Sequence, residues 1–484
     1  MSFREFFLTI SLVFVTLAVL SPHYAIANDS NELENLRALV QQMNLKMEAL
    51  EQRVQSAEES EIKKEQGKPV ISSNQDKYNS GFGIQSADGR NKIQFGGLIQ
   101  LDNRQYFEKN QGDISGFDVR RIRPIIQGTI DGIYDFKFQP EYGDNKAAGS
   151  STNSGIADAY INARFKPWMQ LQIGKFAPDV GLERLESSNF NKFIELSTIS
   201  NNILPNRDIG ISLHGNLLNG KVYYAMGVYQ GVVDGGDAVT SQSYNGDRDY
   251  ALRLFTTPFK GDGSFLSGIG IGLAATYGDA YQSSSAPNSS GLPNYRSSGQ
   301  QSTFFTYGAG VNADGSRTRI SPQAYYYIGP FGLIAEYAEV TQDVSNSSRV
   351  KKGTLHNDAW QFTSSWFLTG EVATHNDPVS PLTPFNLDGD GWGAFELVAR
   401  YQETNIDSRA LSDGWAQDTL SIGPLARSAK AWGAGINWYL TKNVKFAANY
   451  ELTTYEKFVS QLTTRANEQY LLTRIQLAFL KKCY

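Results

Sequence analysis

The chain has 484 residues and a net charge of −5, with 44 Lys and Arg side chains against 49 Asp and Glu. That balance excludes a bulk attraction to nucleic acid, and the single cysteine, Cys483, excludes a disulfide framework within one chain. The mean hydropathy of −0.37 is typical of a soluble protein. The 25 Tyr, 27 Phe and 45 Gly, however, favour many strands joined by turns.

Residues 1–27 have the layout of an export signal. Arg4 precedes an apolar run from Phe6 to Leu20, and Ala25-Ile26-Ala27 supplies a small-x-small cleavage site. The alternative is a membrane anchor helix, but the run of about 15 residues is shorter than the roughly 20 that span a bilayer. We therefore expect export with removal of this segment, and no transmembrane helix in the mature chain.

Residues 28–67 carry apolar side chains at steps of three and four, the spacing of a coiled-coil seam. The seam positions are Leu36, Val40, Met43, Met47, Leu50, Val54 and Ala57. This pattern predicts a short N-terminal α-helical coiled coil that self-associates, and a single amphipathic helix on a surface is the alternative. Gly67-Lys68-Pro69 ends the pattern, so residues 68–78 are predicted to form a linker.

From about residue 79 the apolar side chains recur with period two, as they do in strands. Phe136 and Phe138 fall on one face of such a strand, and Lys137 falls on the other. The same alternation continues to the end of the chain. Residues 79–480 number about 400, which at roughly 25 per strand and connection gives about 16 strands.

The connections between these strands differ in length. Short turns such as Asp131-Gly132 and Gly329-Pro330 alternate with long polar segments such as Gly278–Gln300 and Thr341–Asp358. Short turns on one rim and long loops on the other are typical of an outer-membrane barrel. Aromatic clusters such as Tyr325-Tyr326-Tyr327 fit a girdle at a membrane interface.

The pattern therefore predicts an all-β fold, a transmembrane antiparallel β-barrel of about 16 strands. The barrel would span residues 79–480 in outer-membrane lipid, and residues 481–484 would form a C-terminal extension. A water-soluble barrel or sandwich also alternates, but its polar face would meet bulk solvent. Outer-membrane barrels commonly end on an aromatic residue, a part that Phe479 or Tyr484 can play.

Basic side chains share the polar phase of the predicted strands. An arginine facing lipid costs about 2–4 kcal/mol at the midplane, so the polar phase must line the lumen. Arg120 breaks the alternation, which places it at the rim or on a β-bulge that turns it inward. Rings of Arg and Lys select anions, and arginine offers a planar fork for phosphate or carboxylate oxygens. Pairing with wall carboxylates such as Asp158 and Glu396 is the alternative role for each of them.

The candidate pore-lining and anion-binding residues are basic side chains on the polar phase of the strands or in and beside the loop of residues 177–207. They are Arg120, Arg121, Arg123, Lys137, Arg164, Lys175, Arg207, Arg253, Arg317, Arg319 and Arg400, and Arg474 shares their phase.

Residues 177–207 lack clean period two between a strand that ends near Phe176 and one that begins near Asp208. Such a loop can fold inward and narrow the passage, or project outward, and the sequence leaves both open. Its charged side chains include Glu183, Arg184, Lys192 and Glu195.

Several stretches resemble the phosphate-selective porin family, porins O and P. They are VRRIR, DGIYDFKFQPEYG, DAYINARF, GKFAPDVGLERLESSN, PNRDIGISLHG, GPFGLIAEY and WGAFELVARY, in order across residues 79–480. The resemblance implies a homotrimer of 16-stranded barrels that carries small anions, often phosphate or polyphosphate, past an inward-folded loop. It also maps the family's arginine pair onto Arg120 and Arg121. No cofactor is implied.

Other functions are less consistent with the sequence. An enzyme barrel would need a nucleophile and base, yet no Gly-x-Ser-x-Gly or His-Glu-x-x-His occurs. Asn386–Gly391 resembles the start of a calcium loop, but Leu397 stands where the bidentate Glu should be. An adhesin acting through its long loops, and a general or cation-preferring pore that uses lumen acids such as Glu141 and Glu451, remain as alternatives.

Overall fold

The structure is a computed structural model that describes residues 41–43, 45–50, 70–71, 82–108, 110, 113–143, 155–238, 248–281, 290–416, 422–459, 461 and 463–479. The chain forms two compact units, residues 1–68 and 69–484. In the first unit residues 41–43 and 45–50 are helical. The rest of the predicted coiled coil, the export signal and the C-terminal extension lie outside the described residues. No helix in the described part of the chain is long and apolar enough to cross a membrane.

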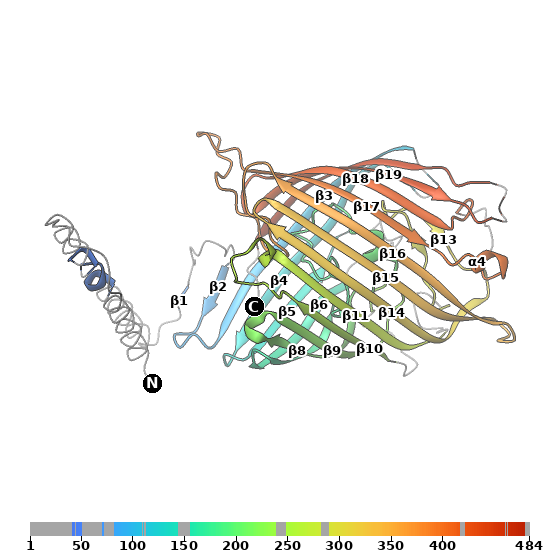
Figure 1. The fold of residues 1–484 in the computed structure, drawn as a ribbon, viewed down its shortest axis with the longest axis horizontal. Coiled ribbons are helices and arrows are strands. Elements are labelled where there is room, and N and C mark those ends of the chain that lie inside the picture. Colours follow the sequence, from blue (N-terminus) through green and yellow to red (C-terminus); the bar gives the residue numbers. More distant parts are fainter. Residues whose placement is uncertain are drawn as a thin grey trace, which may run out of the picture. The chain divides into compact units, whose positions relative to one another are not determined.

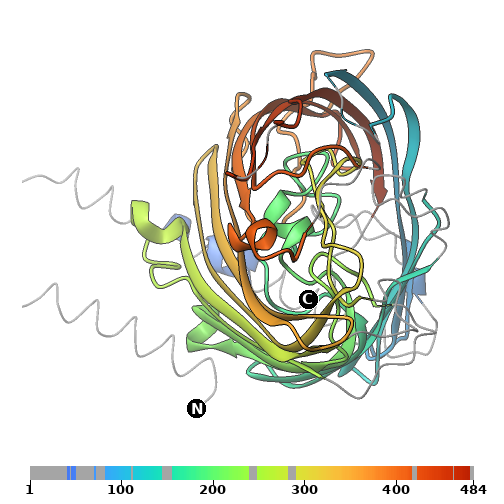
Figure 2. The same ribbon diagram turned by 90° about the vertical axis from the view of Figure 1, so that its right-hand side faces the viewer.

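Sixteen antiparallel strands form a closed barrel. Figure 1 shows the barrel from the side, and Figure 2 shows it from one end. The first barrel strand, β3 (Lys92–Glu108), pairs with the second and also with the last, β20 (Glu468–Phe479), so the ring has no free edge. The strands between them are β4 (Gly116–Ile130), β5 (Tyr134–Glu141), β6 (Gly155–Lys166), β7 (Met169–Phe176), β8 (Asp208–Leu217), β9 (Val222–Tyr229), β10 (Asp249–Thr256), β11 (Ile269–Tyr281), β14 (Val311–Ile328), β15 (Phe331–Asn346), β16 (Lys352–Phe367), β17 (Ala394–Asn405), β18 (Ser428–Tyr439) and β19 (Val444–Glu456).

Two short strands precede the barrel. The strand β2 (Phe82–Gln85) pairs with the first residues of β3, with Phe82 opposite Phe95. The strand β1 (Val70–Ile71) pairs with β2. These two strands extend the sheet beside β3 but are not members of the closed ring.

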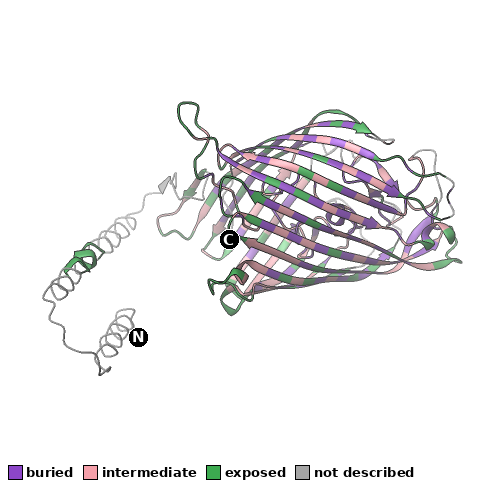
Figure 3. Ribbon diagram, turned by 45° about the horizontal axis from the view of Figure 1, so that its top comes forward, coloured by how far each residue is buried: buried purple, intermediate pink, exposed green. Residues whose placement is uncertain are grey.

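Burial alternates along the strands in the order that period two predicts, as the banding in Figure 3 shows. In β4, Ile122 and Ile126 are 36% and 37% exposed on the outside, whereas Arg121 and Arg123 are 6% and 8% exposed on the inside. The backbone N–H and C=O groups are hydrogen-bonded within the closed ring, so no unsatisfied backbone group faces the hydrocarbon. The outer surface can therefore carry apolar side chains in contact with lipid. The barrel is therefore apolar outside, and charged side chains of its wall are enclosed.

On the outer surface of the barrel, aromatic side chains gather at the rim that carries the short turns. Trp168, Tyr134 and Trp366 are 50%, 41% and 54% exposed there. Of the Tyr325-Tyr326-Tyr327 cluster only the middle ring faces outward, because period two turns its two neighbours into the lumen, where both contact His375. An outer belt of Trp and Tyr at a strand end is the arrangement expected at a membrane interface.

The connections differ in length between the two rims, with two corrections to the prediction. The turns 131–133, 329–330 and 440–443 are short, as expected, but residues 368–393 form a long connection on the same rim. The predicted long loop Thr341–Asp358 is wrong: β15 and β16 continue through it in register, with Thr341 opposite His356, and only residues 347–351 connect them.

Segments of the long connections lie inside the ring of strands (Figure 2). Loop 177–207 crosses it with the helix α3 (Thr198–Asn202), and loop 282–310 carries the hairpin strands β12 (Tyr295–Arg296) and β13 (Thr303–Phe305). The side chains of Ile199, Phe304 and Trp415 belong to one buried apolar cluster inside the ring. The lumen therefore holds apolar side chains in addition to the polar lining that the alternation predicts. The apolar part comes from loops and wall together, because Val340 of β15 and Leu355 of β16 belong to the same cluster.

Candidate pore and its charged lining

Loop 177–207 is held inside the barrel by polar side chains of the wall. Lys192 Nζ lies 2.8 Å from Glu396 Oε1 of β17, and Asn449 Oδ1 of β19 accepts the Ile194 backbone N–H at 2.7 Å. From β20, Gln476 donates to the Asn189 carbonyl at 3.1 Å. The loop therefore crosses the lumen from the β7 side to the opposite wall and narrows the passage, which the sequence alone left undecided.

The backbone explains how Arg120, Arg121 and Arg123 all point inward. Gln100 of β3 lies opposite Arg121, but the next residue, Leu101, lies opposite Val119, so Arg120 is an extra residue in β4. Such a β-bulge lets two successive side chains face the same side. The bulge is one of the two placements that the broken alternation predicts for Arg120.

Arg120 binds Glu195 of loop 177–207, with Nε 3.1 Å from Oε1 and Nη2 3.2 Å from Oε2. Arg104 of β3, which is 1% exposed, binds the same carboxylate. Burial raises the pKa of the Glu195 carboxyl, but the Arg120 and Arg104 guanidiniums outweigh it and hold that pKa well below its usual range. Glu195 is therefore an anion that joins the loop to the arginine cluster.

The other two arginines of the cluster differ in their pairing. Arg123 binds the Glu141 carboxylate and donates to Ser188 Oγ at 2.9 Å. Arg121 donates from Nη1 to the amide oxygen of Gln100 at 2.7 Å, and within the described residues no carboxylate lies within ion-pair distance of it. Arg121 is thus a buried cation whose charge is not neutralised by a direct partner.

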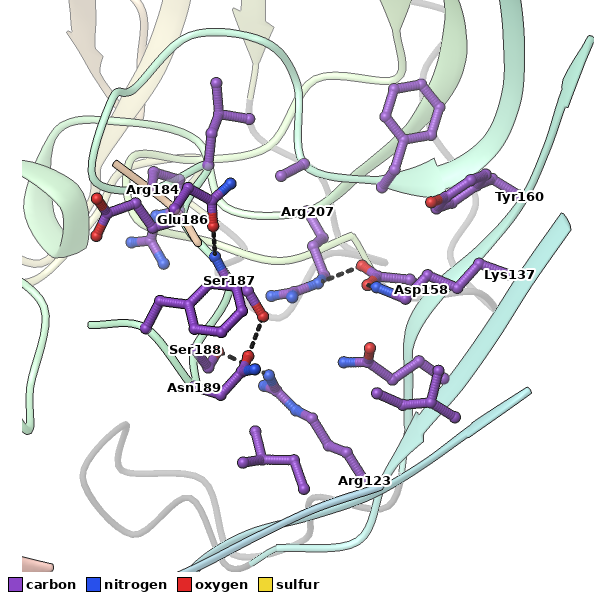
Figure 4. Close-up of a pocket in the computed structure, with 18 of the residues that line it drawn as sticks. Arg123, Lys137, Asp158, Tyr160, Arg184, Glu186, Ser187, Ser188, Asn189 and Arg207 are labelled. Carbon is purple, nitrogen blue, oxygen red and sulfur yellow. Dashed lines mark hydrogen bonds and ion pairs between the residues drawn. The ribbon is translucent and has the colours of Figure 1, made fainter. Parts of the chain in front are cut away.

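A cavity of about 350 Å³ lies between loop 177–207 and the wall strands β4–β7. Figure 4 shows Lys137, Asp158 and Tyr160 on the strand wall, with Ser187, Ser188 and Asn189 facing them from the loop. Arg123 and Arg207 extend into the space between these walls. This cavity beside the loop is the candidate passage.

Two cations of this cavity share one carboxylate. Lys137 Nζ lies 2.7 Å from Asp158 Oδ2, and Arg207 Nε lies 2.7 Å from Asp158 Oδ1. Arg184 also lines the cavity; it binds the Ser200 carbonyl and the Asn201 side chain instead of a carboxylate. Burial lowers the pKa of Arg184 to about 10, so it is still a cation at neutral pH. Asp179 and Glu186 supply negative charge on the same lining.

The remaining predicted residues lie elsewhere, and most bind carboxylates. Arg164 pairs with Asp135 at the short-turn rim, Arg317 and Arg319 both pair with Asp249, and Arg400 pairs with Glu183. Arg474 pairs with Asp102. Lys175 donates to the Ala238 carbonyl, and Arg253 donates to Gln323 between the Tyr223 and Phe255 rings.

Arg104 and His375 were not singled out from the sequence, and Glu336 was placed on the lumen phase without its role. Arg104 lies in phase with Gln100 and Asp102, so the period-two signal that identified the other arginines applied to it as well. Glu336 accepts the Leu182 and Glu183 backbone N–H groups and anchors the loop, a role that no spacing reveals. His375, in connection 368–393, stacks on Tyr325 with ring centroids 4.9 Å apart and lies 2.9 Å from Glu186.

No group of three or more His, Cys, Asp or Glu side chains in the described ranges is arranged to hold a metal ion. The segment that resembles a calcium loop is part of connection 368–393. There Asn386 Oδ1 accepts the Asp388 backbone N–H at 3.0 Å, which is an ordinary turn contact.

A closed 16-stranded barrel, apolar outside and narrowed by an inward loop, is the architecture of a pore-forming protein of the outer membrane. A profile of the family described as phosphate-selective porin O and P matches residues 93–479. The chain belongs to this family, whose members are channels, and its place is the outer membrane of a bacterium.

Two known proteins illustrate the likeness. Porin O of Pseudomonas aeruginosa is 24% identical over 429 residues, which cover 83% of this chain and 92% of that protein. The crystal structure of the outer membrane channel DcaP of Acinetobacter baumannii matches with a TM-score of 0.50 at 9% identity, over 80% of this chain and 97% of that one. At that identity the second likeness concerns the fold alone.

Proposed function

We propose that the chain forms a passive diffusion pore with a moderate preference for small anions such as phosphate. The observation that carries this proposal is the shared carboxylate in the cavity. Asp158 can neutralise only one of Lys137 and Arg207, so one positive charge is left on the wall of the passage.

Two further cations add to this surplus. Arg184 lines the cavity, and Arg121 lies two residues before the lining residue Arg123 in β4; neither has a carboxylate partner in the described part of the chain. Cations in a pore wall raise the local concentration of anions and lower that of cations.

The acids of the lining limit the effect. Asp179 accepts a hydrogen bond from Tyr223 at 2.8 Å and Glu186 lies beside His375, so both stay near the passage as negative charges. Together with Asp237, which accepts the Arg207 backbone N–H at 3.0 Å, they offset much of the surplus positive charge. The selectivity that we propose is therefore a preference, and cations would still pass.

The other predicted lining residues take different roles in this proposal. Arg120, Arg123, Arg164, Arg317, Arg319 and Arg400 hold the loops and wall through ion pairs, while Lys137, Arg207, Arg184 and Arg121 set the field along the passage. Lys175 and Arg253 add positive charge away from the cavity. Phosphate is the favoured solute because the family is described by its selectivity for phosphate.

The remaining parts of the proposal concern export and assembly. Residues 1–27 are a cleaved export signal, residues 28–67 a self-associating coiled coil and residues 68–78 a linker. Residues 79–480 contain the barrel, whose ring runs from β3 to β20 and which acts as a homotrimer in outer-membrane lipid. Three copies of the N-terminal seam joined to three barrels would give the coiled coil its partner helices.

Bilayer recording tests the function directly. The full chain, purified and inserted into a planar bilayer between 0.1 M and 0.01 M KCl, is expected to conduct with a reversal potential of the anion sign. Added inorganic phosphate is expected to reduce the chloride current. Conductance with a zero or cation-signed reversal potential would overturn the preference, and a barrel that does not conduct would point to the adhesin alternative.

A further inference from the structure

The cavity beside loop 177–207 has an aromatic lining as well as a charged one. Phe190 comes from the loop, whereas Tyr160, Phe176 and Tyr223 come from the strands β6, β7 and β9. A passage for hydrated inorganic ions needs no aromatic surface. Aromatic side chains beside convergent charged groups are instead the components of a site that binds and orients an organic ligand.

Phe190 has the fewest contacts with other aromatic rings in this lining. Phe176 is 4% exposed and packs edge-on against Tyr160 and Tyr229, with ring centroids 6.0 and 5.7 Å apart. Phe190, in contrast, is half-buried, and no other described ring lies within stacking distance of it. It therefore offers a phenyl face to whatever enters the cavity.

The charged end of the same cavity has hydrogen-bond donors to spare. Lys137 and Arg207 each use one nitrogen on Asp158, and Arg207 Nη1 contacts Asn206 Oδ1 at 3.3 Å. Arg207 Nη2 makes no hydrogen bond to the rest of the described chain. An ammonium has three donors and a guanidinium five, so this pair can bind the oxygens of an incoming anion without releasing Asp158.

Tyr160 connects the two ends. It lies opposite Lys137 in the pairing of β5 with β6, so its ring stands next to the cation on the strand wall (Figure 4). A ligand whose anionic group binds Lys137 and Arg207 would place its body between Tyr160 and the loop residue Phe190. The cavity volume of about 350 Å³ falls within the roughly 300–1,000 Å³ of sites that hold organic ligands.

We infer that this cavity binds ring-bearing organic anions, with a carboxylate or phosphate at Lys137 and Arg207 and an apolar ring against Phe190 and Tyr160. This inference rests on the proposed function and names a substrate class within it. The site favours such solutes over inorganic anions of the same charge, because the ring removes the exposed phenyl face of Phe190 from water while the charge contacts stay the same.

Competition in bilayers tests the inference with the full-length protein. Phenyl phosphate and inorganic phosphate are added separately to wild-type pores that conduct chloride, and the concentration that halves the current is measured for each. We expect phenyl phosphate to act at about tenfold lower concentration, the gain of one ring contact. Equal concentrations for the two compounds in the wild-type pore would overturn the inference without any variant.

Substitution of the ring locates the site. Phe190→Leu keeps the apolar volume and removes the aromatic face, and it is expected to raise the half-blocking concentration of phenyl phosphate several-fold while that of inorganic phosphate stays unchanged. Phe265→Leu, on the exposed turn η3 (Phe265–Gly268), is the control and should change neither. An equal rise for both compounds in Phe190→Leu would mean that the ring only supports the loop, and would count against the site.

The same bilayers separate this inference from the proposed function. The reversal potential in the KCl gradient reports anion preference without any organic compound. An anion-signed potential together with equal block by the two phosphates would leave the proposed function standing and remove the inference. A cation-signed potential would remove the proposed function itself.

Discussion

The substitution Arg121→Gln tests the origin of the selectivity most directly. It removes one positive charge from the wall, and its amide can still donate to Gln100, the present partner of the guanidinium. Because Arg121 has no carboxylate partner among the described residues, no buried acid is left unpaired. The barrel is therefore expected to assemble normally.

The size of the effect follows from Coulomb's law. A unit charge about 8 Å from a passing ion contributes about 0.5 kcal/mol at the dielectric constant of water. Its removal disfavours an anion and favours a cation by that amount each, a total of about 1 kcal/mol. The ratio of anion to cation permeability should fall about fivefold, and more where the low-dielectric wall strengthens the field.

The assay is the reversal potential of single pores in a KCl gradient near 0.01 M, where the Debye length of about 30 Å leaves the field unscreened. Arg164→Gln is the matched control. It removes the same charge from the short-turn rim, where Arg164 pairs with Asp135 and its side chain is 36% exposed. An equal change in the two variants, or none in Arg121→Gln, would refute a selectivity set by the cluster in the lumen.

Three further variants follow from the same geometry. Asp158→Asn leaves both of its bound cations unneutralised, so the anion-to-cation permeability ratio in bilayers should rise about fivefold; an unchanged ratio would mean that the cavity is not the conducting route. Glu195→Gln removes the anion shared by two buried arginines, which should destabilise the loop by about 3 kcal/mol and expose it to protease in otherwise intact barrels; full resistance would contradict its anchoring role. Ile122→Arg places a charge against lipid and should lower the unfolding free energy in vesicles by about 2–4 kcal/mol, whereas Gln127→Arg, on the inner face of the same strand, should not; equal losses would contradict the inside-out assignment.

The orientation of wall side chains was predictable because a strand has a strict period of two. Arg121 and Arg123 follow from that period, as do the outward Ile122 and Ile126. Arg120 was not decidable, because a bulge is set by the partner strand β3, and a single sequence does not reveal where register shifts. The alternation therefore assigns the face of every residue up to the bulge and fails at the bulge itself.

The error at Thr341–Asp358 has a related cause. Strands β15 and β16 continue through this segment, with Gln342 opposite Leu355 and polar side chains on both faces. Beyond the hydrocarbon no lipid requires the outer face to be apolar, so the alternation fades although the backbone pairing continues. Periodicity marks the lipid-facing part of a strand and not its full length.

The pairing of charges was the part that no sequence pattern carried. Arg317 and Asp249, which lie 2.9 Å apart, are on strands separated by β11, and Glu195 reaches Arg120 only because its loop folds inward. A cation paired with a carboxylate and a cation without such a partner both occupy the polar phase of a strand. The distinction on which selectivity depends therefore appears only in three dimensions.

That distinction also assigns two different tasks to the same kind of residue. Arginines that bind a loop carboxylate, such as Arg400 with Glu183, are enclosed pairs that salt screens little, so the position of the loop should persist across ionic strength. The cations that face the cavity meet water, and their field weakens as salt rises. Width and charge preference should therefore separate in experiment: as salt rises, the anion preference and the extra conductance from enriched anions would both decline, and conductance normalised to bulk conductivity would level off at a value set by the width.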